Sequence, residues 1–283
     1  MLVDKPAGIT SHDVVNAARH ALGTRRIGHG GTLDPFATGL LVLLVGHATR
    51  LLPYLDGEPK VYDATIGFGA ETDTDDMTGS VVRTASLPEP ASVRAAIASL
   101  TGELDQVPPA YSAKQVDGRR AYDVARRGGA LSLEPVRVMV HDWVIRDLTP
   151  ARLEATITCG GGTYIRALAR DLGRLCDSAA HLVALRRTQS GSFRVSDAMS
   201  MDAMRSGEAA PLPPLSALPH LPTVSLSPAD VGHVRQGRAV LAPDQDGGAP
   251  ANKSAMIDDA ARLVAVAERV DNVWQPRVVL PDV

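Results

Sequence analysis

Apolar and polar positions recur along this chain with two periods, and each period predicts one kind of element. An unbroken apolar run predicts a buried strand at 39–45, and strict alternation predicts a half-buried strand at 61–68. Apolar residues at helical spacing predict helices at 11–22, 90–101 and 165–175. Further strands are expected at 136–145, 153–158 and 182–194. Strands and helices therefore both contribute to the fold.

The composition changes after residue 200. Residues 201–222 are acidic and rich in proline, which is typical of a linker. Beyond them, 228–236 predicts a small helix, and 263–267 and 278–280 predict strands. We therefore expect a large domain at 1–200, a Pro-rich linker at 201–222 and a small terminal domain at 223–283. A chain of 283 residues can form two domains because it exceeds the length of one typical domain.

Composition and charge restrict the class of protein. No apolar stretch reaches membrane-spanning length and no leader pattern is present, so we expect a cytoplasmic protein without a membrane partner. Cys159 and Cys176 have neither the number nor the spacing for a zinc site or a disulfide framework. The net charge is −3, but residues 106–194 carry 14 basic and 8 acidic side chains, a net +6. Such a segment suits a polyanion, and it equally suits a solvated face.

A single carboxylate, Asp34, lies between a glycine-rich approach and the buried strand at 39–45. Pro35 pushes Asp34 out of the helical region, and Gly28, Gly30 and Gly31 leave no side chain on the approach. A bulky ligand could therefore reach the carboxylate. The alternative for this motif is an ordinary Asp-Pro turn whose carboxylate caps a local amide.

The basic segment contains a glycine junction that favours an anion. Gly160 to Gly162 connect an expected strand with the helix at 165–175, and N–H groups exposed there attract negative charge. The junction lacks the spacing of a dinucleotide or Walker loop, so we expect no nucleotide cofactor. Tyr164 and Arg166 lie beside the amino-terminal end of this helix. The stretch 71–79 lacks the ligand pattern of a calcium loop, and we interpret it as a polar hairpin connection.

Taken together, the motifs of residues 4–193 resemble those of the TruB-type tRNA pseudouridine synthases. The resemblance rests on five ordered motifs: Gly28-His-Gly-Gly-Thr-Leu-Asp-Pro-Phe-Ala-Thr-Gly39, Tyr62 through Asp76, Pro108-Pro-Ala-Tyr-Ser-Ala113, Gly162-Thr-Tyr-Ile-Arg166 and Leu185-Arg-Arg-Thr188. The family's first strand would be short here, and the terminal domain only loosely resembles the RNA-binding PUA module. The resemblance implies an α+β fold with a mixed, largely antiparallel central sheet flanked by helices, plus a small PUA-like β-rich terminal domain.

The resemblance also implies the activity and the residues that carry it. The domain at 1–200 would be a pseudouridine synthase catalytic domain that isomerises the T-loop uridine at tRNA position 55 by flipping the base, without a metal or organic cofactor. Asp34 would be the catalytic carboxylate, Tyr62 would stack on the base, and Arg166 would keep the carboxylate charged by favouring the anion. The remaining contacts implied for the substrate are His29, Tyr164, Leu185, Arg119, Arg120, Arg126 and Arg127. We expect the protein to bind the T arm of tRNA as a monomer.

Two other functions are compatible with these residues. A non-catalytic RNA-binding protein or tRNA-folding chaperone on the same fold would use the Asp34 loop only to position RNA. An aspartate-nucleophile hydrolase is a weaker alternative because no second carboxylate or metal pattern accompanies Asp34 in its motif. Tyr62 has an alternative of its own, since a tyrosine on an alternating strand is more often a core residue than a catalytic one.

Overall fold

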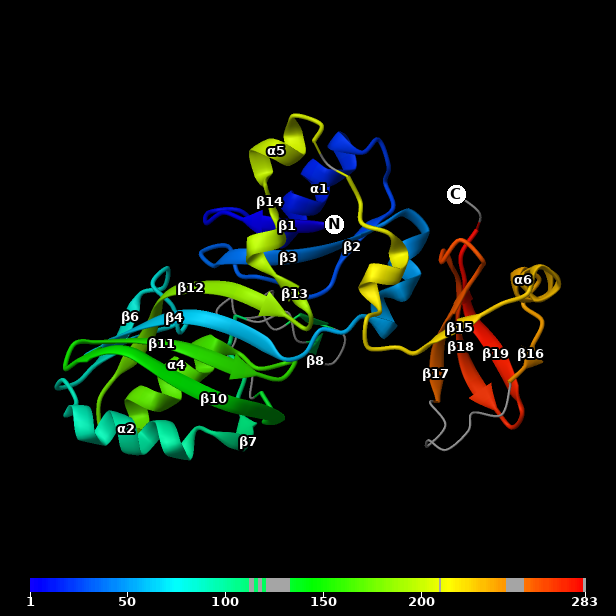
Figure 1. Ribbon diagram of the computed structural model, residues 1–283. Helices are drawn as coiled ribbons and strands as arrows, with labels where there is room; N and C mark the ends of the chain where they lie inside the picture. Colours follow the sequence, from blue (N-terminus) through cyan, green and yellow to red (C-terminus); the bar gives the residue numbers. More distant parts are fainter. Residues whose placement is uncertain (112–114, 117–118, 121–132, 209, 243–251, 282–283) are drawn as a thin grey trace.

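The computed structural model describes residues 1–111, 115–116, 119–120, 133–208, 210–242 and 252–281. They form a ten-stranded sheet and, after it in the chain, a separate five-stranded sheet (Figure 1). No helix within these ranges combines the length and apolar character needed to cross a membrane.

The large sheet has the strand order β14-β1-β3-β12-β4-β11-β10-β7, with β2 added to β3 and β13 added to β12. Its strands are β1 (Leu2–Lys5), β2 (Ile27–His29), β3 (Thr38–Val45), β4 (Lys60–Phe68), β7 (Gly102–Gln106), β10 (Val136–Thr149), β11 (Arg152–Cys159), β12 (Ala180–Ser190), β13 (Phe193–Arg194) and β14 (Met199–Ser200). Among the described strands of this sheet, only β1 with β14 and β3 with β12 pair in parallel. The predicted α+β class with a mixed, largely antiparallel sheet is therefore confirmed.

Two groups of helices cover the sheet. The helices are α1 (Ser11–Ala21), α2 (Pro90–Ser99), α4 (Ile165–Leu175) and α5 (Met201–Arg205), with 3₁₀ turns η1 (Gly46–Tyr54), η2 (Val195–Asp197) and η3 (Pro214–Ala217). α2 and α4 lie against β4, β10 and β11, and their apolar faces share one core with those strands (Figure 1). α1 and α5 pack together over β1 and β3 at the other end. Met201 and Met204 of α5 are buried there, so the expected linker begins with a packed helix.

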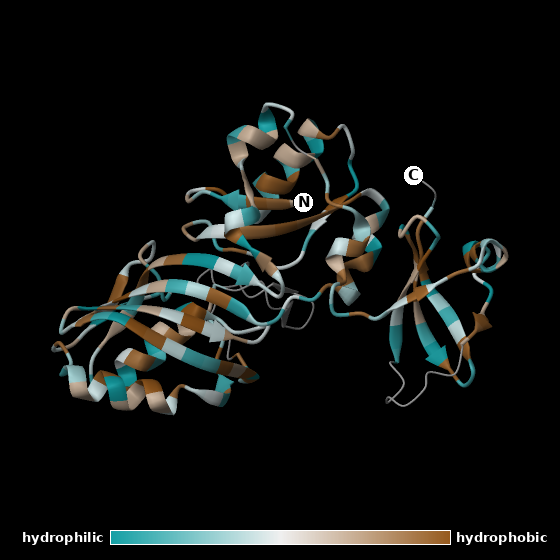
Figure 2. Ribbon diagram, viewed as in Figure 1, coloured by the Kyte–Doolittle hydropathy of each residue, from teal (hydrophilic) through white to brown (hydrophobic). Residues whose placement is uncertain are grey.

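Local sequence accounts for the elements that hold the site. Thr10 caps α1 by accepting from the Asp13 N–H, and the Asp13 carboxylate accepts from the Thr10 N–H, which forms a capping box. β3 is apolar along almost its whole length and is buried on both faces (Figure 2). Gly39, with φ +103°, lets β12 approach, because a side-chain carbon there would lie 2.3 Å from the Arg187 carbonyl oxygen.

The second sheet has the order β15-β17-β18-β19-β16 and carries the helix α6 (Pro228–Arg235). Its strands are β15 (Thr223–Ser225), β16 (Val240–Leu241), β17 (Lys253–Ile257), β18 (Leu263–Val270) and β19 (Val273–Val279). It packs against the first domain through a shared apolar cluster to which Leu44 and Leu51 contribute from one side and Leu263 and Val266 from the other. Two further antiparallel pairs among the described residues are β5 (Ala70–Thr72) with β6 (Val81–Thr84) and β8 (Gln115–Val116) with β9 (Arg119–Arg120).

Candidate active site

The Asp34 loop is held from three sides by buried polar side chains. Lys5, which is fully buried, donates to the carbonyl oxygens of Pro6, Ile9 and Pro35 at 2.9, 2.8 and 3.3 Å. The Ser11 hydroxyl accepts from the Leu33 N–H at 2.8 Å and donates to the Leu33 carbonyl at 3.1 Å.

On the third side, Arg187 is 1% exposed and lies on β12. Its guanidinium donates to the Leu40 carbonyl at 2.8 Å and to the Gly31 carbonyl at 3.1 Å. The backbone around Asp34 is therefore fixed before any ligand binds, which is how a scaffold positions a reactive group.

The Asp34 carboxylate forms a two-point ion pair with Arg166. Arg166 Nε lies 2.9 Å from Asp34 Oδ2, and Arg166 Nη2 lies 3.0 Å from Oδ1. The same guanidinium donates to the carbonyl oxygens of Thr74 and Tyr111, each at 3.0 Å, and lies 3.7 Å from the Asp76 carboxylate. Arg166 is almost fully buried, whereas the Asp34 side chain keeps 33% of its surface exposed. The carboxylate is thus accessible while its partner is held rigidly.

Burial and charge act on Asp34 in opposite directions. Burial raises the pKa of the Asp34 carboxyl, Arg166 lowers it, and the charge of Asp76 raises it again. The pKa of Asp34 lies above that of an ordinary aspartate because burial is the largest of these effects. The expectation that Arg166 favours the anion is right in direction, but Arg166 does not outweigh burial.

Asp34 opens into a cavity of about 240 Å³. Four predicted site residues line it with Asp34: Tyr62, Tyr164, Arg166 and Leu185. The other lining residues are Gly31, Thr32, Leu33, Lys60, Gly162, Thr163, Ile165 and Arg187. The lining combines five apolar or aromatic side chains, two threonines and two glycines with one carboxylate and three basic side chains. A volume of this size can hold one nucleobase.

Tyr62 and Tyr164 reach this cavity from different elements. Tyr62 comes from β4, is 7% exposed, and has its pKa raised by burial, with Arg187 acting in the opposite direction. Tyr164 precedes α4, where Gln106 clamps its backbone: the Tyr164 N–H donates to Gln106 Oε1 at 2.9 Å and Gln106 Nε2 donates to the Tyr164 carbonyl at 3.1 Å. Tyr62 is therefore both buried in the core and exposed to the cavity, so geometry alone leaves both interpretations of it open.

The comparisons with known proteins agree over almost the entire chain. Residues 19–165 match the model for the TruB family pseudouridylate synthase (N terminal domain), and residues 166–209 match the tRNA pseudouridylate synthase B C-terminal domain. The tRNA pseudouridine synthase B of Geobacter sulfurreducens is 39% identical over 97% of this chain and 94% of its own length. That of Thermobifida fusca is 41% identical over 99% and 97%. The chain belongs to the TruB family.

The fold of a solved structure agrees with this membership. A chain from an H/ACA ribonucleoprotein bound to a substrate RNA containing 2′-deoxyuridine superimposes with a TM-score of 0.73. The alignment covers 99% of this chain and 84% of that chain, at 22% identity. At this identity the likeness establishes the fold alone. The predicted family and fold class of this TruB protein are confirmed.

Three arginines of α4 contact an acidic segment that we had interpreted as a polar connection. Arg166, Arg170 and Arg174 recur every four residues on one helix face. Arg170 Nη1 lies 3.0 Å from the Asp75 carboxylate, and Arg174 pairs with Glu71. The stretch is a hairpin connection, but four of its polar side chains are buried: Glu71, Thr72, Asp75 and Asp76. The helical spacing of the arginines was the signal that could have revealed these pairs.

The remaining predicted residues lie elsewhere or outside the described chain. His29 on β2 does not line the cavity, and its Nδ1 is buried without a hydrogen bond to any described group. Burial, followed by the charge of Arg187, lowers the pKa of His29. Arg119 and Arg120 form β9, but their side chains lie outside the described residues, and Arg126 and Arg127 lie wholly outside them.

The glycine junction holds an anion supplied by the protein itself, because the Gly161 N–H donates to the Glu58 carboxylate at 2.7 Å. Within the described ranges, no three His, Cys, Asp or Glu side chains group together as metal ligands would. Cys159 and Cys176 are buried free thiols. The polar side chains that line the cavity are those of Asp34, Arg166, Tyr62, Tyr164, Thr32, Thr163, Lys60 and Arg187.

Proposed function

We propose that this TruB-family enzyme converts uridine 55 in the T loop of tRNA to pseudouridine, with Asp34 as the catalytic carboxylate. The observation that carries the proposal is the two-point ion pair of Asp34 with Arg166 at the wall of a cavity sized for one base. The relatives, named tRNA pseudouridine synthase B, supply the substrate class. Membership of their family favours catalysis over the alternative of a non-catalytic RNA-binding protein.

The reaction explains why a closed cavity with one carboxylate is needed. Isomerisation breaks the bond between N1 and C1′ of uridine, turns the base and joins C5 to C1′. The proton leaves C5 and N1 gains one, so no atom is added and no electron is transferred. An ionised Asp34 can attack C6 or C1′, or remove a proton from C2′. The apolar wall at Leu185 leaves the detached base free to turn, and the limited volume keeps it from leaving.

The other lining residues have roles that follow from their positions. Tyr62 offers an aromatic face to the base, and its hydroxyl is the candidate for moving the C5 proton. Arg166 orients the Asp34 carboxylate and stabilises its charge. Tyr164, with its backbone clamped by Gln106, closes the cavity beside Arg166. Arg166 is therefore a positioning residue for Asp34.

Substrate access requires the uridine to leave the stacked loop. Extruding a base costs a few kcal/mol, which stacking on an aromatic side chain and contacts to phosphates offset. We assign the phosphate contacts to the basic residues Arg119, Arg120, Arg126 and Arg127, and we assign His29 to turning the base out. We take a monomer acting on the T arm as the working unit of this proposal.

Mapping pseudouridine in tRNA after incubation with the purified protein tests this proposal. We expect the modification at position 55 only, and its loss in the Asp34→Asn variant. That change is nearly isosteric but removes the negative charge and the nucleophilicity. A melting curve and an RNA-binding curve like those of the parent would show that only the chemistry was lost. Turnover by Asp34→Asn at a measurable fraction of the parent rate would disprove the role of Asp34.

A further inference from the structure

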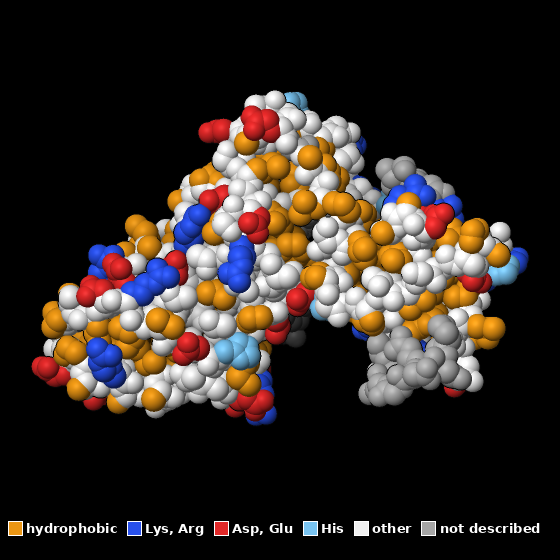
Figure 3. Space-filling model, viewed as in Figure 1, with side chains coloured by type: hydrophobic (Ala, Val, Ile, Leu, Met, Phe, Trp, Pro, Cys, Tyr) orange, Lys and Arg blue, Asp and Glu red, His pale blue; other side chains and the backbone are white. Residues whose placement is uncertain are grey.

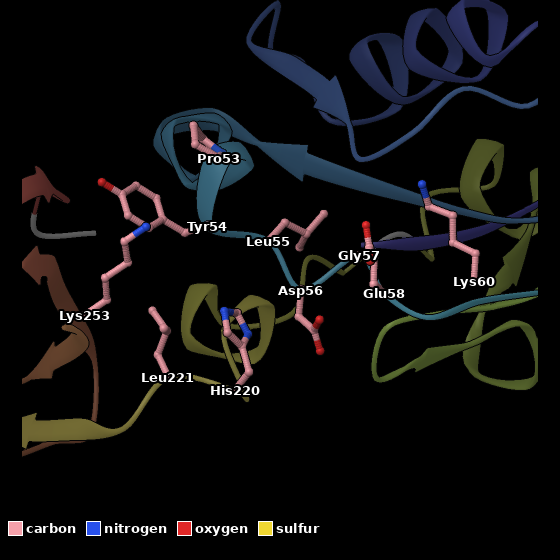
Figure 4. A pocket seen from close by; sticks show the side chains of 10 residues that line it. All are labelled: Pro53, Tyr54, Leu55, Asp56, Gly57, Glu58, Lys60, His220, Leu221 and Lys253. Atoms are coloured by element: carbon pink, nitrogen blue, oxygen red, sulfur yellow. The ribbon is translucent and has the colours of Figure 1, made fainter. Parts of the chain in front are cut away.

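The cavity of Asp34 adjoins a second, more open groove, and Lys60 belongs to both. The groove has a volume of about 500 Å³ and lies between the start of β4, the segment before β15 and strand β17. It is lined by Pro53, Tyr54, Leu55, Asp56, Gly57, Glu58, Lys60, His220, Leu221 and Lys253. Figure 4 shows Lys60 at one end of the groove and Lys253 with Tyr54 at the other. The space-filling view is hollowed between the two domains (Figure 3).

The Lys60 ammonium has no hydrogen-bonded or ion-paired partner among the described residues, although the charge of Glu58 raises its pKa. Within the described residues it donates no hydrogen bond and forms no ion pair, although it is only partly exposed. Of the two carboxylates beside it in the chain, Glu58 binds the Gly161 N–H and the Asp56 carboxylate lies apart from it (Figure 4). A partly buried charge without a partner is costly, so a site of this kind is expected to receive an anion.

Two cationic nitrogens converge on empty space beside Gly31. A side-chain carbon built on Gly31 would lie 3.8 Å from Lys60 Nζ and 3.5 Å from Arg187 Nη1. No other described atom beyond the chain neighbours comes within 4 Å of that position. Gly31 has φ +126°, a conformation that glycine adopts without strain, so the space is maintained by the backbone. This corner opens into the cavity that contains Asp34.

The electrostatics of the corner favour a group with negative charge. Burial lowers the pKa of Lys60, and the neighbouring charge of Arg187 lowers it further. Cys159 and the carboxylate of Glu58 act in the opposite direction without outweighing these two effects, so the ammonium stays unfavourable until an anion is added. A phosphodiester carries the compensating charge, and it is the anion that accompanies a uridine into this cavity.

We propose that the Lys60–Gly31–Arg187 corner binds a phosphodiester that flanks the target uridine, with Lys60 donating to a phosphate oxygen. This inference rests on the proposed function, because it takes RNA as the substrate. Arg187 is fully buried and contributes its charge, while Lys60 makes the direct contact. The neighbouring nucleotide then leaves the cavity along the groove toward the second domain.

A double-mutant cycle between protein and RNA tests the contact. The protein change is Lys60→Met, which keeps most of the aliphatic stem, and the RNA change is one methylphosphonate at either linkage flanking the target uridine in a T-arm stem-loop. Each change alone should weaken equilibrium binding about tenfold, the scale of a charge-assisted hydrogen bond. When the methylphosphonate replaces the contacted linkage, the protein change and the RNA change together should weaken binding no further than either change alone. The stem-loops used for binding already carry pseudouridine at the target position, so turnover does not change the ligand during the measurement.

The controls separate this contact from general effects. Lys60→Met should also lower the slope of log affinity against log salt concentration by about one, and Lys60→Arg should restore binding. Lys253→Met, at the other end of the same groove, should show purely additive losses. If the loss of binding from Lys60→Met adds to the loss from the methylphosphonate at both linkages, the inference is overturned. If Lys60→Met fails to fold, the parent protein alone still tests the inference. Binding of both methylphosphonate RNAs as tightly as the unmodified stem-loop would then overturn it.

Pseudouridine formation by the parent on the unmodified stem-loop is scored separately. If the parent forms no pseudouridine, the proposed function is refuted. If it forms pseudouridine but the binding losses from the protein change and the RNA change simply add, only the contact of Lys60 is refuted.

Discussion

At the scale of single residues, the chemistry depends on a carboxylate whose surroundings act against its charge. Asp34 is mostly enclosed, faces the further carboxylate of Asp76, and is kept in place by the guanidinium of Arg166. Its pKa is raised, so a smaller fraction is ionised at a given pH than for an ordinary aspartate. An anion with few solvent contacts is correspondingly more basic and more nucleophilic.

The raised pKa of Asp34 predicts where the rate declines on the acid side of the pH–rate profile. The ionised form is lost as the pH falls, so the single-turnover rate should decline at a higher pH than the titration of an ordinary aspartate would give. Arg166→Lys should move this decline to higher pH, because a single ammonium replaces the two-point pair that lowers the pKa. Melting curves at each pH exclude unfolding. A decline that moves to lower pH in Arg166→Lys would contradict this assignment.

Two substitutions separate catalysis from packing at Tyr62. Tyr62→Phe keeps the ring and removes the hydroxyl, and Tyr62→Leu removes the aromatic face. On the catalytic interpretation both variants melt near the parent temperature, Tyr62→Phe binds tRNA without turnover, and Tyr62→Leu is also inactive. On the core interpretation activity follows stability, with Leu destabilising by roughly 1 to 3 kcal/mol. Single-turnover kinetics beside thermal melts distinguish the two, and a fully active Tyr62→Phe would remove the hydroxyl from the mechanism.

At the scale of elements, helix α4 connects the active site to two segments far from it in the chain. Arg170 pairs with Asp75, and it also donates to the Val107 carbonyl at 2.8 Å. One turn earlier, Arg166 contacts Thr74 and Tyr111 of the same two segments. Positioning of Arg166 therefore depends on a row of buried ion pairs along the helix.

Removing Arg170 should destabilise the protein in a pH-dependent way. Burial raises the pKa of Asp75 to about 6, so this carboxylate is ionised at pH 8 and mostly protonated at pH 5. At pH 8, Arg170→Met leaves a buried charge unpaired and should cost about 3 to 5 kcal/mol in urea unfolding. At pH 5 the loss should be much smaller, because a protonated Asp75 needs no cation.

Arg146→Met removes a more exposed pair with Asp63 and serves as the control. It should cost less than about 1 kcal/mol at both pH values. An equal loss at pH 5 and pH 8 for Arg170→Met would show that Asp75 does not titrate as assigned.

At the scale of the whole molecule, two domains share an apolar cluster, and charge is distributed unevenly along the chain. The cluster joins Leu44 and Leu51 to the second sheet. The net charge is +6 for residues 106–194 and −3 for the whole chain, although Arg166, Arg170 and Arg187 of that segment are buried.

The basic segment should dominate the salt dependence of tRNA binding. Replacing Arg119, Arg120, Arg126 and Arg127 with Gln should weaken binding and lower the slope of log affinity against log salt by about one per lost phosphate contact. The rate of the chemical step on bound tRNA should change little. Four matched replacements in the second domain, at Arg235, Arg238, Arg269 and Arg277, provide the comparison. An unchanged slope for the first set would show that these arginines face solvent.

The sequence by itself predicted the main helices and the central strands, and a family resemblance named five of the residues that line the cavity. The helices at 11–22, 90–101 and 165–175 and the strand at 61–68 lie within two residues of their predicted bounds, because periodicity and capping act over a few residues. Strands β2, β7, β14, β15, β16 and β17 were not predicted, because they are short or lack alternation. The cavity brings together Asp34, Tyr62, Tyr164, Arg166 and Leu185, but the sequence grouped them only through a family resemblance.

Only the tertiary structure decided which charges meet and how deeply they are buried. Asp34 and Arg166 are separated by 132 positions in the chain, and no local pattern records their distance. Lys5 and Arg187 look like ordinary basic residues in the sequence, yet both are fully buried and hold the Asp34 loop. Burial and pairing depend on how sheet and helix pack, so the raised pKa of Asp34 and the unpaired ammonium of Lys60 exist only in the folded chain.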